Sequence, residues 1–379
     1  MFERYIYHGK EKLRCGFTTG TCAAAASKAA AKALLTGENV SSVRILVPKG
    51  IELEITIESC IIKTDYAQCA VRKDSGDDPD ITNGIIISVC AEKKAFGIEI
   101  TGGDGIGTVT CPGLDQPVGA AAINSVPRRM IVQAVKEISE EYDYYGGFKI
   151  TVSVPGGAEL AKKTYNPRMG IQGGISIIGT NGIVEPMSSS ALIETIRIEE
   201  RMKKEAGIKN LLITIGNYSE DFLTEKMPYI SAKGVKCSNY IGEAIDFALE
   251  YGFESILIVG HIGKLVKLGA GIMNTHSAQA DGRMDVLVTC AVLAGVSCDI
   301  LRKIPECMTV DAAIEIFKNN GTMDKVSDIL MERAEYYLNA KVKNEVQIGA
   351  LMFSNKYGII GQTSCVDAII QNITEEYNG

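Results

Sequence analysis

Glycine and small polar residues follow three short apolar segments in the second half of the chain. The segments are residues 175–178, 211–215 and 255–259, and the residues that follow them are Gly179, Thr180, Asn181 and Gly182; Gly216 and Asn217; Gly260 and His261. In open parallel sheets, ligands bind beyond the carboxyl ends of strands, where glycines let backbone N–H groups approach them. One such glycine would mean little, but three in succession predict loops on one edge of a sheet. We expect them to bind a small molecule with an extended, adenosyl-sized part.

Positively charged side chains accompany these loops and the start of a predicted helix. They are Arg128, Arg129, Arg168, Lys264, Lys267 and Arg283. Two arginines in a first helical turn oppose the helix dipole, so either an acidic partner or an anionic ligand should lie beside Arg128 and Arg129. Guanidinium groups bind carboxylates through paired hydrogen bonds. A polycarboxylate ligand would therefore suit this set.

Two residues are candidates for proton transfer, His261 at a strand end and Asp104 in the run TGGDGIGT. A histidine titrates near neutral pH, although a lone histidine is more often structural than catalytic, and the same holds for His276. The G-x-G-x-G spacing around Asp104 resembles a dinucleotide loop. An extended segment follows it where a phosphate-binding turn would need a helix, so a glycine-rich hairpin is favoured.

Two further polar runs have a structural and a functional interpretation. Thr18 and Thr19 precede an alanine-rich segment, where they either cap a helix or form an anion nest. The run KDSGDDPD resembles a calcium loop but lacks the EF-hand pattern and its closing glutamate, so an acidic turn is favoured. No histidine or cysteine spacing is typical of zinc, and we expect no metal bound by protein side chains.

The pattern of predicted helices and strands around these residues changes along the chain. Residues 21–35 predict a helix, several β-like runs follow up to residue 101, and residues 127–141 predict an amphipathic helix. We expect an α+β domain with a largely antiparallel sheet over residues 1–160. Apolar strands then alternate with helices, which predicts an α/β, Rossmann-like domain with a mainly parallel sheet over residues 161–379. The junction is placed within about 147–174, in a loop rich in Gly and Pro.

The composition narrows the class of protein. The chain has 379 residues, 46% of them hydrophobic, and 39 Lys and Arg against 46 Asp and Glu give a net charge of −7. The acidic balance argues against nucleic-acid binding. We find neither a signal-peptide core nor a membrane-spanning run. The 11 cysteines, without a C-x-x-C pair, favour reduced thiols in the cytoplasm. Residues 284–296 suit either a core or the interface of a homo-oligomer.

Six segments between about residues 13 and 283 carry long, distinctive motifs. They are CGFTTGTCAAAASKAAAKALLTG, KDSGDDPDITNG, GGDGIGTVTCPGL, AINSVPRRMI, NPRMGIQGGISIIGTNGIVEPMS and GHIGKLVKLGAGIMNTHSAQADGR. Together and in this order they resemble the cobalt-precorrin-5B C-1-methyltransferase family of anaerobic cobalamin biosynthesis. The tail after about residue 296 is less distinctive.

The resemblance implies a reaction and roles for the residues above. The family transfers a methyl group from S-adenosylmethionine to C-1 of a polycarboxylated corrinoid that already contains cobalt, and the product is cobalt-precorrin-6A. On this basis the 179–182 and 216–217 loops are expected to hold the cofactor. His261 or Asp104 would assist proton or charge balance. The substrate carboxylates would be oriented by Thr18, Thr19, Arg128, Arg129, Arg168, Lys264 and Lys267. The usual methyltransferase glycine motif, with an acidic residue closing the next strand, is not recognisable.

Two other functions remain open from the residues alone. A non-catalytic corrinoid carrier would use the same cations and would bind the macrocycle without measurable affinity for S-adenosylmethionine. Another nucleotide-dependent α/β transferase or dehydrogenase would use the glycines at 103–107 and would bind a nicotinamide cofactor or ATP. That binding would be lost on Gly105→Val.

Overall fold

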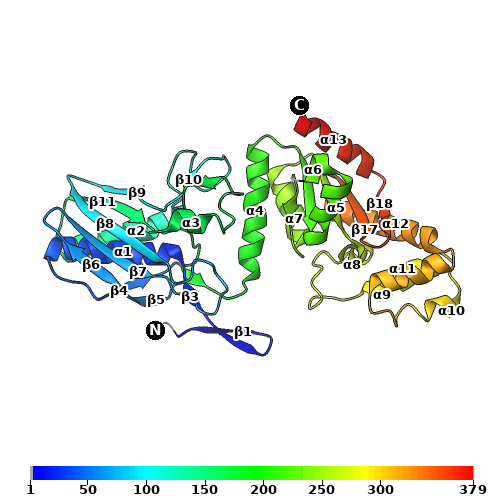
Figure 1. The fold of residues 1–379 in the computed structure, drawn as a ribbon, viewed down its shortest axis with the longest axis horizontal. Coiled ribbons are helices and arrows are strands. Elements are labelled where there is room, and N and C mark those ends of the chain that lie inside the picture. The colour runs from blue at the N-terminus through cyan, green and yellow to red at the C-terminus, as the bar shows by residue number, and fades with distance from the viewer. Residues whose placement is uncertain (1–2, 232, 379) are drawn as a thin grey trace. The chain divides into compact units, whose positions relative to one another are not determined.

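The computed structural model describes residues 3–231 and 233–378, which fall into two compact units, Met1–Ser189 and Ser190–Gly379 (Figure 1). The division thus lies later than the 147–174 window expected from the sequence. Short pairings keep the intervening segment in the first unit: β12 (Ile171–Gln172) pairs with β10 (Thr108–Val109), and β13 (Ile183–Val184) pairs with β3 (Gly16–Phe17). Two-residue strands of this kind leave no periodic signal in the sequence.

A five-stranded sheet forms the main layer of the first unit. Its order is β6 (Ser59–Ile62), β7 (Tyr66–Arg72), β8 (Ile86–Lys94), β11 (Gly147–Ser153), β9 (Ile98–Gly102). Neighbouring strands are antiparallel except β11 and β9, which run parallel. Two antiparallel pairs lie outside this sheet: β1 (Tyr5–His8) with β2 (Glu11–Arg14), and β4 (Ser42–Leu46) with β5 (Glu52–Thr56).

An alanine-rich helix, α1 (Thr19–Thr36), packs against β7, β8 and β4 and against α2 (Ser125–Glu141). Thr18 caps its N-terminus by accepting the Thr21 N–H at 3.2 Å, and Gly37 ends it in the left-handed region at φ 71°. Fourteen of its 18 residues are buried. Such burial on all sides is feasible because alanine side chains let neighbouring layers approach closely. The helix predicted over residues 21–35 is confirmed.

The amphipathic pattern predicted over residues 127–141 is also observed, since α2 buries Met130, Ile131, Ala134, Val135 and Ile138. A short helix, α3 (Gly157–Ala161), follows the sheet. Among the described residues, no helix has both the length and the apolar character that crossing a membrane requires. All 11 cysteines are free thiols.

The second unit contains a sheet of the order β15 (Val235–Lys236), β14 (Asn210–Ile215), β16 (Ser255–His261), β17 (Gln347–Ser354), β18 (Gly358–Gln362). The first four strands run parallel and β18 is antiparallel. The predicted combination of an antiparallel and a parallel sheet is therefore confirmed. The segment 175–178 does not join the parallel sheet, because Ile175 and Ile177 form bridges with Ile106 and Ile123 in the first unit.

Helices cover both faces of the parallel sheet, and this burial explains why its strands are apolar throughout. Leu212, Leu257 and Phe353 face a core shared with α5 (Asn217–Lys226), α6 (Pro228–Ser231) and α13 (Val366–Asn378). Leu211 and Ile258 face the opposite core. The helices that contribute to it are α4 (Ser189–Glu205), α7 (Ile241–Tyr251), α8 (Ile262–Leu265), η1 (Val266–Ala270), α9 (Arg283–Leu293), α10 (Cys298–Leu301), α11 (Val310–Asn319) and α12 (Met323–Lys341).

Candidate functional site

The carboxyl ends of β14 and β16 lie side by side at the point where the chain changes face. After β14 the chain enters α5 on one face, and after β16 it enters α8 and η1 on the other. Numbered by position along the chain, the strand order is 2-1-3-4-5. In this order the crevice between strands 1 and 3 is the usual ligand site. Gly216 and His261 flank that crevice.

Gly216 presents an open backbone at this edge. Its φ of +76° lies in the left-handed region, and a Cβ built there would meet one neighbour within 4 Å, the Lys264 Nζ at 3.8 Å. The next residue, Asn217, begins α5 and accepts a hydrogen bond from Lys236 through its Oδ1. The absence of a side chain at Gly216 therefore leaves room beside the Lys264 ammonium for a ligand to approach the backbone.

His261 ends β16 and caps α8. Its Nδ1 accepts the Gly263 N–H at 3.0 Å, so in the neutral ring the hydrogen lies on Nε2, which is 4.0 Å from Asp311 Oδ2. Burial lowers the pKa of His261, and the nearby Asp311 opposes that shift only partly. The imidazole is therefore neutral at pH 7 and presents an N–H donor rather than a free basic nitrogen.

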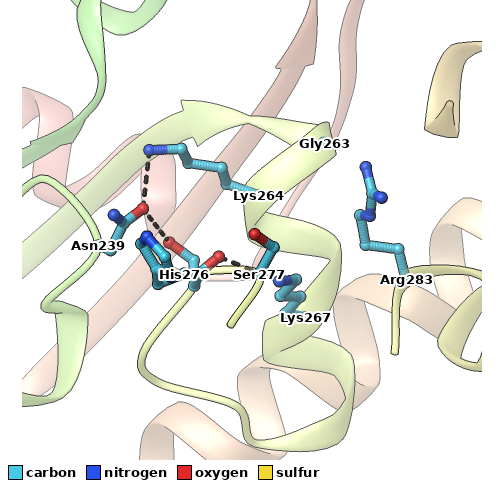
Figure 2. Close-up of a pocket in the computed structure, with 8 residues that line it drawn as sticks. Asn239, Gly263, Lys264, Lys267, His276, Ser277 and Arg283 are labelled. Carbon is cyan, nitrogen blue, oxygen red and sulfur yellow. Dashed lines mark hydrogen bonds between the residues drawn. The ribbon is translucent and has the colours of Figure 1, made fainter. Parts of the chain in front are cut away.

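A pocket of about 430 Å³ is formed by residues that follow the strands β15 and β16 in the chain (Figure 2). It is lined by Asn239, Gly263, Lys264, Lys267, Thr275, His276, Ser277 and Arg283. The Oδ1 of Asn239 accepts hydrogen bonds from Lys264 Nζ at 2.9 Å and from Thr275 Oγ1 at 3.1 Å. Asn239 thus fixes the position of the Lys264 side chain. The pocket wall contains three cationic residues and no acidic one.

The three cations of this pocket differ in their surroundings. Lys267 is 2% exposed, and its Nζ donates to the carbonyl oxygens of Thr275 at 3.0 Å and Ala280 at 2.6 Å. Arg283 forms an ion pair with Asp281. Burial lowers the pKa of both Lys264 and Lys267. Lys267 therefore tethers the 275–280 loop, whereas Lys264 points into the space beside Gly216.

The predicted loop at 179–182 lies in the first unit and packs against the start of α1. Thr18 N–H donates to the Gly182 carbonyl at 3.1 Å, and Thr19 Oγ1 both donates to and accepts from the backbone of Ile178. A Cβ at Gly179 would lie 2.2 Å from Thr18 Oγ1. The expectation that this loop shares a sheet edge with Gly216 is wrong, because residues 175–178 pair within the first unit.

Within that loop, Thr180 is exposed, and Asn181 Oδ1 accepts the Ile183 N–H at 2.9 Å. Both residues therefore belong to a turn of the first unit. Their assignment to the cofactor stays a prediction.

Arg128 and Arg129 begin α2 but point to different surroundings. Arg128 donates to the carbonyls of Ile123 at 2.8 Å and Ile100 at 3.3 Å, and burial lowers its pKa. The acidic partner expected at this helix start is Asp115, whose carboxylate accepts the Ser125 N–H and whose charge partly offsets the effect of burial on the pKa of Arg128. Arg129 is exposed. Arg128 thus stabilises the first unit, and Arg129 remains available to a ligand.

Arg168 and Asp104 are exposed residues of the first unit. The guanidinium of Arg168 lies 5.8 Å from the centre of the Tyr165 ring. Asp104 belongs to a turn in which a Cβ at Gly105 would approach the Val154 carbonyl to 1.9 Å. This turn joins β9 and β10, which belong to different sheets, so the hairpin expected there is wrong. Its glycines serve close backbone packing.

The acidic run after β7 is occupied by contacts within the protein. Asp74 binds the Arg14 guanidinium through two hydrogen bonds of 2.6 and 2.7 Å, and Asp80 pairs with the buried Lys73. Asp77 and Asp78 accept the backbone N–H groups of Arg14 and Met187. In the part of the chain that the structure describes, no group of three or more His, Cys, Asp or Glu residues is placed to hold a metal ion.

Sequence reasoning missed Asn239 and left out Ser277 and Asp311. Asn239 follows β15, a strand of two residues that is too short to be recognised from its pattern. Had β15 been recognised, the strand-end argument that identified Gly216 would have pointed to residues 237–239 as well. Ser277 adjoins His276, whose segment was already noted.

Comparisons with known proteins cover most of the chain. The family model described as CbiD matches residues 6–186, and that described as CbiD, C-terminal domain, matches residues 274–364. A cobalt-precorrin-5B C(1)-methyltransferase of Ruminiclostridium cellulolyticum is 46% identical over 353 residues, which are 93% of this chain and 92% of the relative. Its counterpart in Alkaliphilus metalliredigens is 40% identical over 375 residues, 99% and 98% of the two chains.

One solved structure is also similar, the crystal structure of a cobalamin biosynthesis protein (cbiD) from Archaeoglobus fulgidus. It is 33% identical, with a TM-score of 0.41, and the match covers 74% of this chain and 87% of the other.

Proposed function

The chain belongs to the CbiD family, and on that basis we propose that it methylates C-1 of cobalt-precorrin-5B with S-adenosylmethionine as the methyl donor. The product is cobalt-precorrin-6A, an intermediate of anaerobic cobalamin biosynthesis. The observation that carries the proposal is the near full-length similarity to curated methyltransferases at 40–46% identity. Cobalt belongs to the substrate in this reaction.

The residues around the β14 and β16 strand ends suit the donor, and we assign its site to this Rossmann-like unit. Gly216 offers an open backbone, Asn217 and Asn239 carry amides, and Lys264 offers a cation for a carboxylate. S-adenosylmethionine supplies an electrophilic methyl group when bound. One feature departs from common nucleotide sites: β15 closes with Lys236 rather than with an acidic residue that would bind ribose hydroxyls.

The substrate is a polycarboxylate, and cationic side chains are its natural ligands. In the first unit, the exposed Arg129 and Arg168 remain candidates, with Thr18 and Thr19 acting chiefly as helix-capping and loop-binding residues. In the second unit, Lys264 lines the pocket beside Gly216. Within the unit that binds the macrocycle, these side chains would orient it rather than react with it.

Positioning supplies most of the catalysis in this proposal, since holding two reactants in line lowers the barrier substantially. The protein therefore needs no covalent intermediate. His261 is neutral and can donate a hydrogen bond through Nε2, whereas Asp104 is an exposed carboxylate of the first unit. His261 or Asp104 would assist proton or charge balance at the macrocycle.

The proposal is tested by calorimetric titration with S-adenosylhomocysteine, with NAD and ATP as controls. We expect selective binding of S-adenosylhomocysteine and a loss of about tenfold or more in affinity for Gly216→Ala, because its Cβ enters the open space at the strand end. Gly252→Ala is the control for adding a methyl group at a positive φ, since it has open space around it and lies at the end of α7, before the amino end of β16. Gly252 has φ 71° and ψ 45°, whereas Gly216 has φ 76° and ψ 179°, where alanine is more strained. The midpoint of thermal unfolding of both variants is therefore measured as well, to separate backbone strain from loss of binding.

Two outcomes would contradict this assignment. Equal losses in both glycine variants would mean that backbone strain, not the strand-end site, weakens binding. If the wild-type protein neither binds S-adenosylhomocysteine nor turns over cobalt-precorrin-5B, the methyltransferase assignment itself is excluded.

A further inference from the structure

Two lysines of the pocket beside Gly216 lack a carboxylate partner, whereas the third cation, Arg283, is paired with Asp281, whose charge also acts on Lys267. Among the residues that the structure describes, no carboxylate lies within ion-pair distance of Lys264 Nζ or Lys267 Nζ, and the pocket lining contains no Asp or Glu. The chain as a whole has more acidic than basic residues, with a net charge of −7. The lack of a carboxylate beside these two lysines is therefore a local feature of the pocket. Partly buried ammonium groups without a carboxylate are costly unless something else pairs with them.

The two lysines of this pocket have different roles. Lys267 donates hydrogen bonds to the carbonyls of Thr275 and Ala280 and so holds the 275–280 loop, which contributes part of the lining. Within residues 3–231 and 233–378, Lys264 has a single protein acceptor, Asn239 Oδ1, although an ammonium group carries three donor hydrogens. Figure 2 shows Lys264 extending toward Asn239, while Arg283 stands apart from both. Lys264 is therefore the cation with hydrogen-bonding capacity left for a ligand.

We propose that this pocket is a carboxylate-binding subsite in which Lys264 binds the ligand, Asn239 positions the lysine, and Lys267 maintains the loop wall. The proposal rests on the proposed function for the source of the carboxylate. Two sources have the same chemistry: the amino-acid carboxylate of the methyl donor, and an acetate or propionate side chain of the macrocycle. The Lys264 Nζ lies 3.8 Å from the position that a Cβ on Gly216 would occupy, so the subsite borders the strand-end site in either case.

The experiment compares Lys264→Gln with the matched control Lys325→Ala, which removes one exposed charge from α12 of the same unit. Affinities for S-adenosylhomocysteine and for methylthioadenosine, which lacks the carboxylate, are measured by calorimetry, and the KM for cobalt-precorrin-5B is measured by turnover. A charge-assisted hydrogen bond predicts a change of about tenfold or more in Lys264→Gln and none in Lys325→Ala.

The pattern of losses identifies the source. Weaker binding of S-adenosylhomocysteine with unchanged methylthioadenosine affinity places the donor's carboxylate in the pocket. An unchanged affinity for both nucleosides with a raised KM for the macrocycle places a substrate carboxylate there. Unchanged values throughout, or equal losses in Lys325→Ala, overturn the proposal.

A separate readout keeps the subsite testable if the methyltransferase assignment fails. Citrate, a small polycarboxylate, should raise the midpoint of thermal unfolding of the wild type relative to chloride at equal ionic strength, because ligands of the native state stabilise it. The shift should shrink in Lys264→Gln and persist in Lys325→Ala. A shift that does not depend on Lys264 would contradict the subsite, and a dependent shift without any methyltransferase activity would leave the subsite standing alone.

Discussion

Three buried or half-buried ionisable side chains of the second unit differ in what surrounds them. Lys264 and Lys267 are three residues apart, yet one borders open space and the other is sealed against two backbone carbonyls. From the sequence, both lysines were predicted to orient substrate carboxylates. The spacing of residues indicates which side chains share a helix face, but it does not indicate which backbone carbonyls they will contact. Glu200 on α4 is a third case: it is fully buried, and neither carboxylate oxygen has a hydrogen-bond partner among the described residues.

Lys267→Met should lower the free energy of unfolding by about 1–3 kcal/mol, because the carbonyls of Thr275 and Ala280 lose their donor while the side-chain volume is kept. Urea denaturation of the wild type, the variant and Lys325→Met measures this. A variant as stable as the wild type would mean that relief of the buried charge offsets the lost hydrogen bonds.

Glu200 makes stability depend on pH in a definite direction. Burial raises the pKa of Glu200 to about 9, and Glu199 adds to the shift, so the folded protein keeps this carboxyl protonated well above the pKa of an unfolded glutamate. Because the folded state then binds the extra proton, its contribution is full at low pH and is lost as pH rises from about 4.5 toward 9, by at most about 1.4 kcal/mol per pH unit.

Glu200→Gln should abolish that dependence, so the variant gains on the wild type as pH rises between 5 and 9. Denaturation curves across this range of about four units give the difference directly. A gap that stays constant with pH would show that Glu200 titrates alike in both states.

Close backbone packing governs the elements of the first unit. The start of α1, the 178–182 turn and the strand β3 are joined by backbone hydrogen bonds, and glycines occupy the contacts where no Cβ fits. The sequence predicted the helix at 21–35, the helix at 127–141 and the strands β14 and β16, because each has a strong local period. Segment 175–178 has the same apolar, glycine-ended pattern as β14, but its partners, Ile106 and Ile123, lie far away in the chain.

The sequence also predicted part of the candidate site. Strand-end reasoning pointed to Gly216, His261 and Lys264, which the structure brings to one edge of the sheet. It could not find Asn239, because the strand before it has two residues, and it could not separate the 179–182 turn from this edge. Sheet membership depends on long-range pairing, which local period does not encode.

Gly182→Ala tests this packing at the level of elements. Gly182 has φ +85° and its Cβ would lie 2.5 Å from Val47 Cβ, whereas Gly119 has φ +87° with nothing within 4 Å. Both alanine variants carry a left-handed strain of about 1–2 kcal/mol. Gly182→Ala should lose about 1–3 kcal/mol more from overpacking, measured by thermal unfolding. Equal losses in the two variants would mean that the 178–182 turn shifts without cost.

At the scale of the whole molecule, the two units have separate cores. In the part of the chain that the structure describes, the core of the first unit ends at Ile183 and the cores of the second begin at Ile196, and they share no buried residue. Each unit therefore contains the apolar burial that cooperative folding needs.

Calorimetric unfolding should accordingly show two transitions, each sensitive to changes in one unit. Gly119→Ala should lower the midpoint of one transition and Lys267→Met that of the other, while S-adenosylhomocysteine should raise only the transition affected by Lys267→Met. A single transition that all three changes shift together would show that the units unfold as one.

The buried alanine helix α1 has a consequence for how this chain can vary over generations. Ala23–Ala26 and Ala29–Ala31 have no exposed surface, and sheet and helix close on them from several sides. A single base change turns an alanine codon into one for valine, threonine, serine, proline, aspartate, glutamate or glycine. Most of these add atoms or a charge where neither fits, and proline and glycine disfavour the helix itself. Changes at the third base of an alanine codon are silent, but most changes at the first two bases would destabilise this helix, so these seven positions should stay alanine over long evolutionary times.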